Sequence, residues 1–100
     1  GATIERQIEI LKRQLLLAER IEKSVTLHVV RAFHHILSLR RDIRPRQRWV
    51  IHGFRGKPEL ALQLLNAGFD LSFGQRYNVE SYRLTPDDRK HHETDSEAPF

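Results

Sequence analysis

The sequence predicts an α/β fold in which helices alternate with parallel strands. Segments with apolar residues at three- and four-residue spacing alternate with short runs rich in β-branched and aromatic residues. The first three runs are separated by helical segments, and a crossover of that length joins parallel strands. We therefore expect a parallel sheet with right-handed crossovers, in a single domain that spans residues 1–100.

The composition is that of an ordinary globular chain with a modest core. Hydrophobic residues make up 39% of the chain and charged residues 30%. The chain has no cysteine, which excludes disulfides and thiolate metal sites and favours a cytoplasmic location. No apolar run is long enough to span a membrane, so we expect no membrane partner. The net charge of +4 is compatible with a phosphate-bearing partner without requiring one.

The first half of the chain predicts a helix, a strand and a second helix. Apolar residues recur at helical spacing from Ile4 to Ile21, and Thr3 is suited to cap the start of this helix. Ser24 to Val30 is nearly continuous in apolar character, which predicts a strand covered on both faces. Helical spacing returns from Arg31 to Arg41.

A basic connector follows from Arg40 to Arg48, where Pro45 argues against a helix. One interpretation is a small nucleic-acid-binding patch. The other, which we favour, is a solvated loop whose cations lie near a helix C-terminus, because basic runs are common and nonspecific. The binding interpretation would depend on Arg40, Arg41, Arg44, Arg46 and Arg48.

The second half predicts three more strands. Trp49–Ile51 reads as a buried strand, and a helix follows that begins at Pro58 and ends before Gly68. Phe69–Phe73 is the next strand. The segment after it is weakly patterned and predicts a short helix or an ordered loop. Residues 89–95 are the fourth candidate strand, although their composition is poor for one.

Polar residues stand where three of these strands end. His28 follows the first strand, His52 follows the second, and Asp95 ends the fourth. The spacing between them corresponds to about one and then about two strand–helix units. The carboxyl ends of parallel strands meet at one edge of the sheet, where α/β folds assemble their sites. We therefore predict that these three residues converge on one site.

Four short motifs occur in order along most of the chain, and together they resemble a known family. His52-Gly53-Phe54-Arg55-Gly56 is similar to a His-x-Phe-Ser-Gly segment, and residues 67–74 are similar to a Gly-Phe-x-Ile-Ser strand. Glu93-Thr94-Asp95, with Pro99, resembles a Glu-Thr-Asp-x-Pro strand end. Val25-Thr26-Leu27-His28, with Ala32, resembles a Pro-Val-x-x-His-x-Arg-x-Ala segment. The ordered set resembles the TatD family of metal-dependent deoxyribonucleases.

This resemblance implies a partial (β/α)8 barrel of the TIM type, of which the chain would supply about the fourth to seventh strands. A chain that folds alone would instead form an open three-layer sheet. The resemblance assigns His28, His52 and Asp95 as metal ligands, with Asp95 also catalytic. The family's early His-x-His pair and middle-strand glutamate have no counterpart here. We therefore expect a divalent ion (Mg²⁺, Mn²⁺ or Zn²⁺) to bind weakly.

The resemblance also implies roles for neighbouring residues. Glu93 would orient a metal ligand without binding the ion, and Arg31 and Arg55 would hold the substrate phosphate. Arg55 stands where the family usually has serine or threonine. Residues 90–92, Lys-His-His, stand where the family has an apolar run before its Glu-Thr-Asp motif.

The predicted function is hydrolysis of DNA phosphodiesters by a TatD-like enzyme. Whether this chain is active stays open, because half of the metal site has no counterpart in it. One alternative is a non-catalytic half-barrel scaffold. The unpaired strand edges of such a sheet would pair with a second copy or with the missing barrel fragment. The other alternative is the small basic nucleic-acid-binding module.

Overall fold

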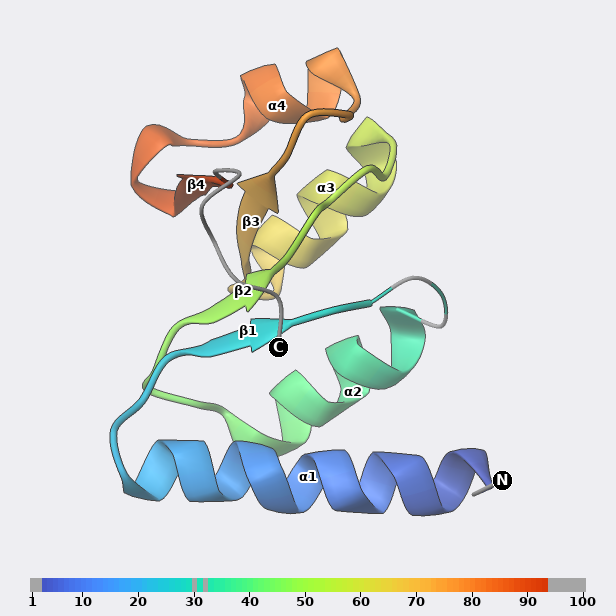
Figure 1. The fold of residues 1–100 in the computed structure, drawn as a ribbon, viewed down its shortest axis with the longest axis vertical. Helices are drawn as coiled ribbons and strands as arrows, with labels where there is room; N and C mark the ends of the chain where they lie inside the picture. Colours follow the sequence, from blue (N-terminus) through green and yellow to red (C-terminus); the bar gives the residue numbers. More distant parts are fainter. Residues whose placement is uncertain (1–2, 30, 32, 94–100) are drawn as a thin grey trace.

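The computed structural model describes residues 3–29, 31 and 33–93, and it shows helices alternating with parallel strands (Figure 1). The predicted α/β fold class is confirmed. The strands are β1 (Val25–Leu27), β2 (Trp49–Ile51), β3 (Asp70–Phe73) and β4 (Lys90–His92). The helices are α1 (Ile4–Arg20), α2 (Phe33–Ile43), α3 (Pro58–Asn66) and α4 (Val79–Leu84), with the short 3-10 helix η1 (Asp87–Arg89) before β4.

The strands pair in the order in which they occur in the chain. All the pairings are parallel, and the sheet order is β1-β2-β3-β4. A (β/α)8 barrel uses this sequential order, whereas doubly wound sheets reverse direction at a switch point. The arrangement is consistent with part of a barrel or with an open sheet.

The helix ends follow from local sequence. The Thr3 hydroxyl accepts a hydrogen bond from the Arg6 backbone N–H at 3.2 Å and so caps α1, as predicted. Pro58 occupies the first turn of α3, and Gly68 adopts a φ of 102° just past its end, a conformation that favours glycine. None of the described helices combines the length and the apolar character needed to cross a bilayer.

Two sequence-based expectations about the first half of the chain are wrong in detail. Helix α2 continues through Ile43, so the first part of the predicted connector is helical. Arg44, with a φ of 51°, then leaves the helix, which places Pro45 outside it. Strand β1 is covered on one face only, since Thr26 is exposed in the described structure.

Strand β4 forms despite its polar composition, because tertiary contacts supply what its sequence lacks. The Lys90 ammonium lies 3.8 Å from the centre of the Tyr82 ring, and the His92 Nε2 lies 2.8 Å from the Tyr82 hydroxyl. On the other face, the His91 Nε2 lies 2.8 Å from an oxygen of the buried Asp70 carboxylate. Aromatic and carboxylate partners thus replace the apolar neighbours of an ordinary buried strand.

The sheet has an apolar face and a polar face. Leu27 pairs with Ile51, and Ile51 with Leu71, so these side chains share the face that packs against the helices. Residues one position away point to the opposite face. That face carries Thr26, Val50, Asp70, Ser72 and His91. In β1, β2 and β3 the polar side chains therefore lie on the face away from the core, whereas β4 also carries Lys90 and His92 on the face of Leu71 and Phe73.

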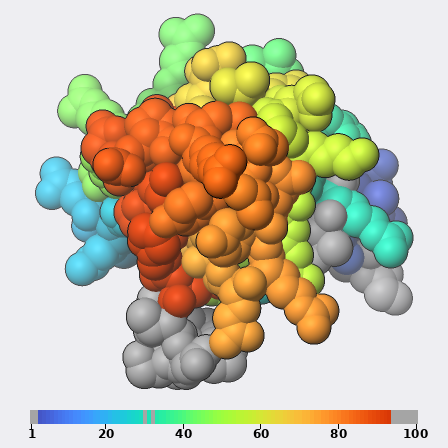
Figure 2. Space-filling model, turned by 90° about the horizontal axis from the view of Figure 1, so that it is seen from above, coloured from blue at the N-terminus to red at the C-terminus, as the bar shows by residue number. Residues whose placement is uncertain are grey.

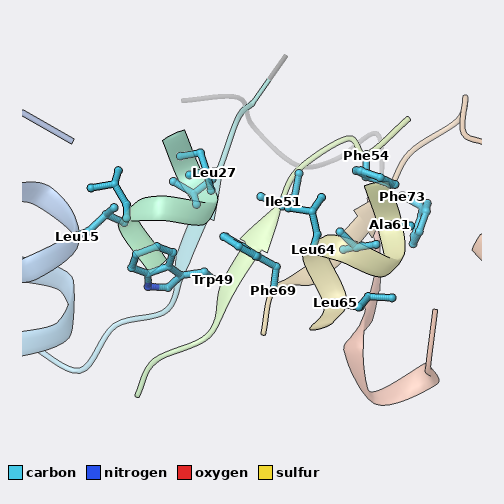
Figure 3. Packing of buried hydrophobic residues seen from close by; sticks show 13 residues of the cluster. Leu15, Leu27, Trp49, Ile51, Phe54, Ala61, Leu64, Leu65, Phe69 and Phe73 are labelled. Carbon is cyan, nitrogen blue, oxygen red and sulfur yellow. The ribbon is translucent and has the colours of Figure 1, made fainter. Parts of the chain in front are cut away.

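The apolar core fixes the segment that carries His52 (Figure 3). The Phe54 side chain is 2% exposed and meets the Phe73 ring edge-on, with 6.1 Å between ring centres. The Phe54 backbone N–H also donates to the Ser72 carbonyl at 2.9 Å. Burial of a phenylalanine side chain contributes about 1.5–3 kcal/mol, so the loop after β2 is held in place two residues beyond His52.

Candidate active site

His28 and His52 lie side by side where β1 and β2 end. The His52 N–H donates to the Leu27 carbonyl at 2.8 Å, which extends the pairing of the two strands by one residue. The centres of the two imidazole rings are 5.2 Å apart, near the spacing of about 4.8 Å between neighbouring strands. The structure thus brings together two of the three residues predicted to share a site.

Glu93 reaches the same edge from β4 by crossing the end of β3. Its backbone N–H donates to the Phe73 carbonyl at 3.0 Å. Its carboxylate oxygen Oε2 accepts a hydrogen bond from the Gly53 N–H at 2.5 Å and lies 3.5 Å from the His52 Nδ1. The second distance is longer than a direct hydrogen bond, so the contact with His52 is electrostatic. Glu93 is therefore placed to orient the segment that carries His52.

Two glycines accommodate the Glu93 carboxylate, Gly74 through the space that it leaves and Gly53 through its backbone N–H. A Cβ on Gly74, just after β3, would lie 2.8 Å from Glu93 Oε1, which no side chain tolerates without displacing the carboxylate. Gly53 has a φ of 61°, which favours glycine, and its N–H points to the carboxylate. Gly74, at the end of β3, therefore has no side chain where the Glu93 carboxylate lies.

Two of the three residues predicted to bind a metal ion, His28 and His52, lie among the described residues. His28 and His52 offer two imidazoles, which suit Zn²⁺ and other divalent transition metals. Within residues 3–29, 31 and 33–93, no group of three or more histidine, cysteine, aspartate or glutamate side chains is arranged to hold a metal ion. Asp95, the predicted third ligand and catalytic residue, lies outside the described residues. Two donors without a third hold a divalent ion weakly.

A cleft of about 350 Å³ adjoins the Glu93 carboxylate. It is lined by Gly53, Arg55, Gly74, Gln75, Arg76 and Glu93. Arg55, which was predicted to hold substrate phosphate, lies at this cleft. Arg31, predicted for the same role, is exposed beyond β1 and is not among the lining residues.

Sequence reasoning missed Arg76. The usable signal was its place in the chain, three residues after Phe73 and within the loop that follows the third strand. Loops that follow parallel strands open onto the edge where α/β sites form. Arg76 was overlooked because its segment shows no clear periodicity and carries no family motif.

A second cluster of charged groups surrounds Asp70 at the opposite end of β3. The Asp70 side chain is 3% exposed and lies 2.7 Å from the Arg48 Nη1 and 2.8 Å from the Arg89 Nε. The His91 Nε2 is a third neighbour, at 2.8 Å. Burial alone would raise the pKa of Asp70, but the hydrogen bonds from His91, Arg48 and Arg89 outweigh it and lower that pKa.

Two arginines of the basic connector, Arg40 and Arg48, bind other groups of the folded chain. The Arg40 Nε donates to the Ala67 carbonyl, and the guanidinium lies 5.7 Å from the Trp49 ring centre. Burial, and next the nearby Arg89 charge, lower the pKa of Arg40. Arg48 is paired with Asp70. These two arginines support the core, which favours the structural interpretation of the connector over the nucleic-acid patch.

Polar side chains at the carboxyl ends of parallel strands occupy the place where (β/α) barrels carry their active sites. The chain matches, over residues 1–100, the family model described as TatD related DNase. It therefore belongs to the TatD family, whose members are generally metal-dependent, and the resemblance predicted from its motifs is confirmed. A search of the curated proteins found no match.

Proposed function

We propose that this chain carries part of a metal-dependent site that hydrolyses DNA phosphodiesters. The observation that carries the proposal is the juxtaposition of His28 and His52, with ring centres 5.2 Å apart, at the carboxyl edge of a parallel sheet. Membership of the TatD family supports the hydrolase class. The Glu93 carboxylate lies beside His52, where it would orient the imidazole ring for metal binding.

His28 and His52 would hold the ion together with Asp95, and Asp95 would also be catalytic. A bound Mg²⁺, Mn²⁺ or Zn²⁺ lowers the pKa of water and polarises a phosphoryl oxygen. Glu93 faces the Nδ1 atom of His52, which leaves the Nε2 atom of that ring available to bind the metal ion. Arg55, at the cleft beside Glu93, would hold a phosphate of the substrate strand through charge-assisted hydrogen bonds. Arg31 would approach the same substrate from the loop after β1.

Calorimetric titration with Mn²⁺ and with Zn²⁺ tests the site. We expect weak, micromolar binding by the natural chain and its loss in the double variant His28→Ala/His52→Ala. The matched control is His34→Ala/His35→Ala, which removes an adjacent histidine pair on α2 with ring centres 4.0 Å apart. Nuclease assays on the same variants follow. Absent binding, or binding that the His28/His52 substitutions leave unchanged, would contradict the proposal.

We also propose that the chain associates with a second copy or with a complementary barrel fragment, and that it acts in the cytoplasm. Strands β1 and β4 are the outer strands of the sheet, so each leaves one edge unpaired within the described residues. Helix α1 adds exposed apolar side chains at Ile10, Leu17 and Ile21. Sedimentation at several concentrations checks this idea, and a monomer at every concentration would overturn it.

A further inference from the structure

We propose that Arg55 and Arg76 together bind a second phosphate of the substrate strand, next to the phosphate that is cleaved. The cleft would thereby select a chain with at least two phosphates over an isolated phosphodiester. This inference rests on the proposed function, because it takes the histidine pair as the place of cleavage. Arg55 comes from the loop between β2 and α3, and Arg76 from the loop between β3 and α4.

The lining of the cleft indicates which part of a nucleic acid it takes. None of its lining residues has an aromatic or aliphatic side chain. Nucleic-acid bases are held in such sites mainly by stacking on aromatic rings, which this cleft lacks. Two arginines and a glycine-lined floor instead suit a phosphate group and its sugar, because glycine lets a ligand approach the backbone closely.

The two arginines of the cleft, Arg55 and Arg76, are available to bind an anion. Within the described residues, Arg55 and Arg76 are exposed and neither forms an ion pair with a carboxylate. By contrast, Arg48 and Arg89 are both held by Asp70. The acid of the cleft, Glu93, is engaged by the Gly53 N–H. An incoming phosphate would thus meet two unpaired guanidinium groups.

The position of Glu93 separates this cleft from the histidine pair. Its carboxylate lines the cleft and also lies 3.5 Å from the His52 Nδ1. A phosphate at the histidines and a phosphate at the arginines would therefore both be neighbours of this carboxylate, which repels both from its own position. Figure 2 shows the molecule from above, with α4 and the loop that precedes it (orange) at the surface. The loop that carries Arg76 is therefore open to a strand in solution.

The test compares two substrates in three variants. The substrates are a fluorescein-labelled ten-nucleotide single strand and bis(p-nitrophenyl) phosphate, which has one phosphate. We expect Arg76→Gln to raise KM for the strand about tenfold, the effect of losing one charge-assisted hydrogen bond, with kcat nearly unchanged. The same variant should leave kcat/KM for bis(p-nitrophenyl) phosphate unchanged. Arg76→Lys should keep part of the affinity because it retains the charge.

Arg83→Gln is the matched control, since Arg83 is an exposed arginine on α4 with its own partner, Glu80, at 3.9 Å. Equal losses in Arg76→Gln and Arg83→Gln, or equal losses on both substrates, would overturn the inference. Binding of the labelled strand, followed by fluorescence anisotropy in EDTA, separates the two proposals. If the natural chain cleaves neither substrate, the hydrolase proposal fails. The anisotropy of Arg76→Gln against Arg83→Gln then decides whether the two arginines bind phosphate.

Discussion

The two ends of the sheet carry the same kinds of side chain, but these are buried and tightly paired at one end and more loosely paired at the other. At the amino ends of the strands, Asp70 is buried and takes contacts from Arg48, Arg89 and His91. At the carboxyl ends, Glu93 meets His52 at a distance longer than a hydrogen bond. Histidines, arginines and an acid occur at both ends. The partners of a charged residue, and not its type, therefore decide whether it supports the fold or remains available for a ligand.

The exposed fractions of the side chains also differ between the amino-end and the carboxyl-end cluster. The Asp70 side chain is 3% exposed, whereas those of Glu93 and His52 are 16% and 34% exposed. A charge that is both buried and paired is costly to disturb, while a partly exposed one can exchange its partner. The amino-end cluster should therefore control stability, and the carboxyl-end cluster should control binding.

The largest expected effect is on stability, from Asp70→Ala. Removal of the shared acid leaves Arg48 and Arg89 without their carboxylate, and the loss of hydrogen bonds between charged groups costs about 1.5–3 kcal/mol. Urea unfolding at pH 7 measures this loss. Asp87→Ala is the control, because the Asp87 side chain is fully exposed and its change should stay within about 0.5 kcal/mol. Equal losses in both variants would contradict the division of roles between the two clusters.

Glu93→Gln should act on metal binding and leave stability nearly intact. The substitution keeps an oxygen that can accept from Gly53 but removes the charge facing His52. Loss of such an orienting carboxylate lowers metal affinity by about 10–100-fold. Calorimetric titration with Zn²⁺ gives the affinity, and Glu80→Gln, an exposed acid on α4, is the control. A loss of stability with unchanged metal affinity would group Glu93 with Asp70.

Acidification should weaken the amino-end cluster by a smaller amount. The pKa of Asp70 is lower in the folded chain than its ordinary value of 3.8. The ionised carboxylate therefore stabilises the fold at pH values well above 3.8, and this contribution is lost as the pH falls through the lowered pKa. Unfolding followed between pH 5 and pH 2 should show a steeper decline in the natural chain than in Asp70→Asn. Parallel curves would contradict the role of Asp70.

The smallest effect is expected from the exposed arginines of the connector. The triple variant Arg41→Gln/Arg44→Gln/Arg46→Gln should change the free energy of unfolding by about 0.5 kcal/mol or less for each substitution. It should also leave the salt dependence of DNA binding unchanged. A decrease of about one unit in that slope for each arginine removed, with binding that survives His52→Ala, would favour the nucleic-acid-binding module.

Local patterns were sufficient to predict the alternation of elements. Apolar spacing predicted α1 and α3, and the capping by Thr3 and the first-turn position of Pro58 follow from a few neighbouring residues. Strand β4 was placed only approximately, within residues 89–95, because Lys90, His91 and His92 have the composition of a surface segment. Its partners, Tyr82 and Asp70, lie 8 or more positions away in the chain, beyond the reach of a periodicity argument.

The site was predictable where it coincides with strand ends. His28 and His52 follow β1 and β2 directly, so the geometry of a parallel sheet was enough to bring them together. The close approach of Gly74 to the Glu93 carboxylate was not visible, since that carboxylate arrives from β4. Arg76 was missed for a similar reason. Its relation to Arg55 exists only once β2 and β3 are paired.

The crossing of Glu93 over the end of β3 has a consequence for the order in which the molecule assembles. The histidine pair requires only β1 and β2, but the cleft requires β4 to dock, because its acid and the hydrogen bond to Gly53 arrive with that strand. Local unfolding that releases β4 alone would remove one wall of the cleft, while His28 and His52 would stay side by side. Hydrogen exchange at the Gly53 amide should then report the undocking of β4, ahead of exchange at the His52 amide, which is bonded to Leu27.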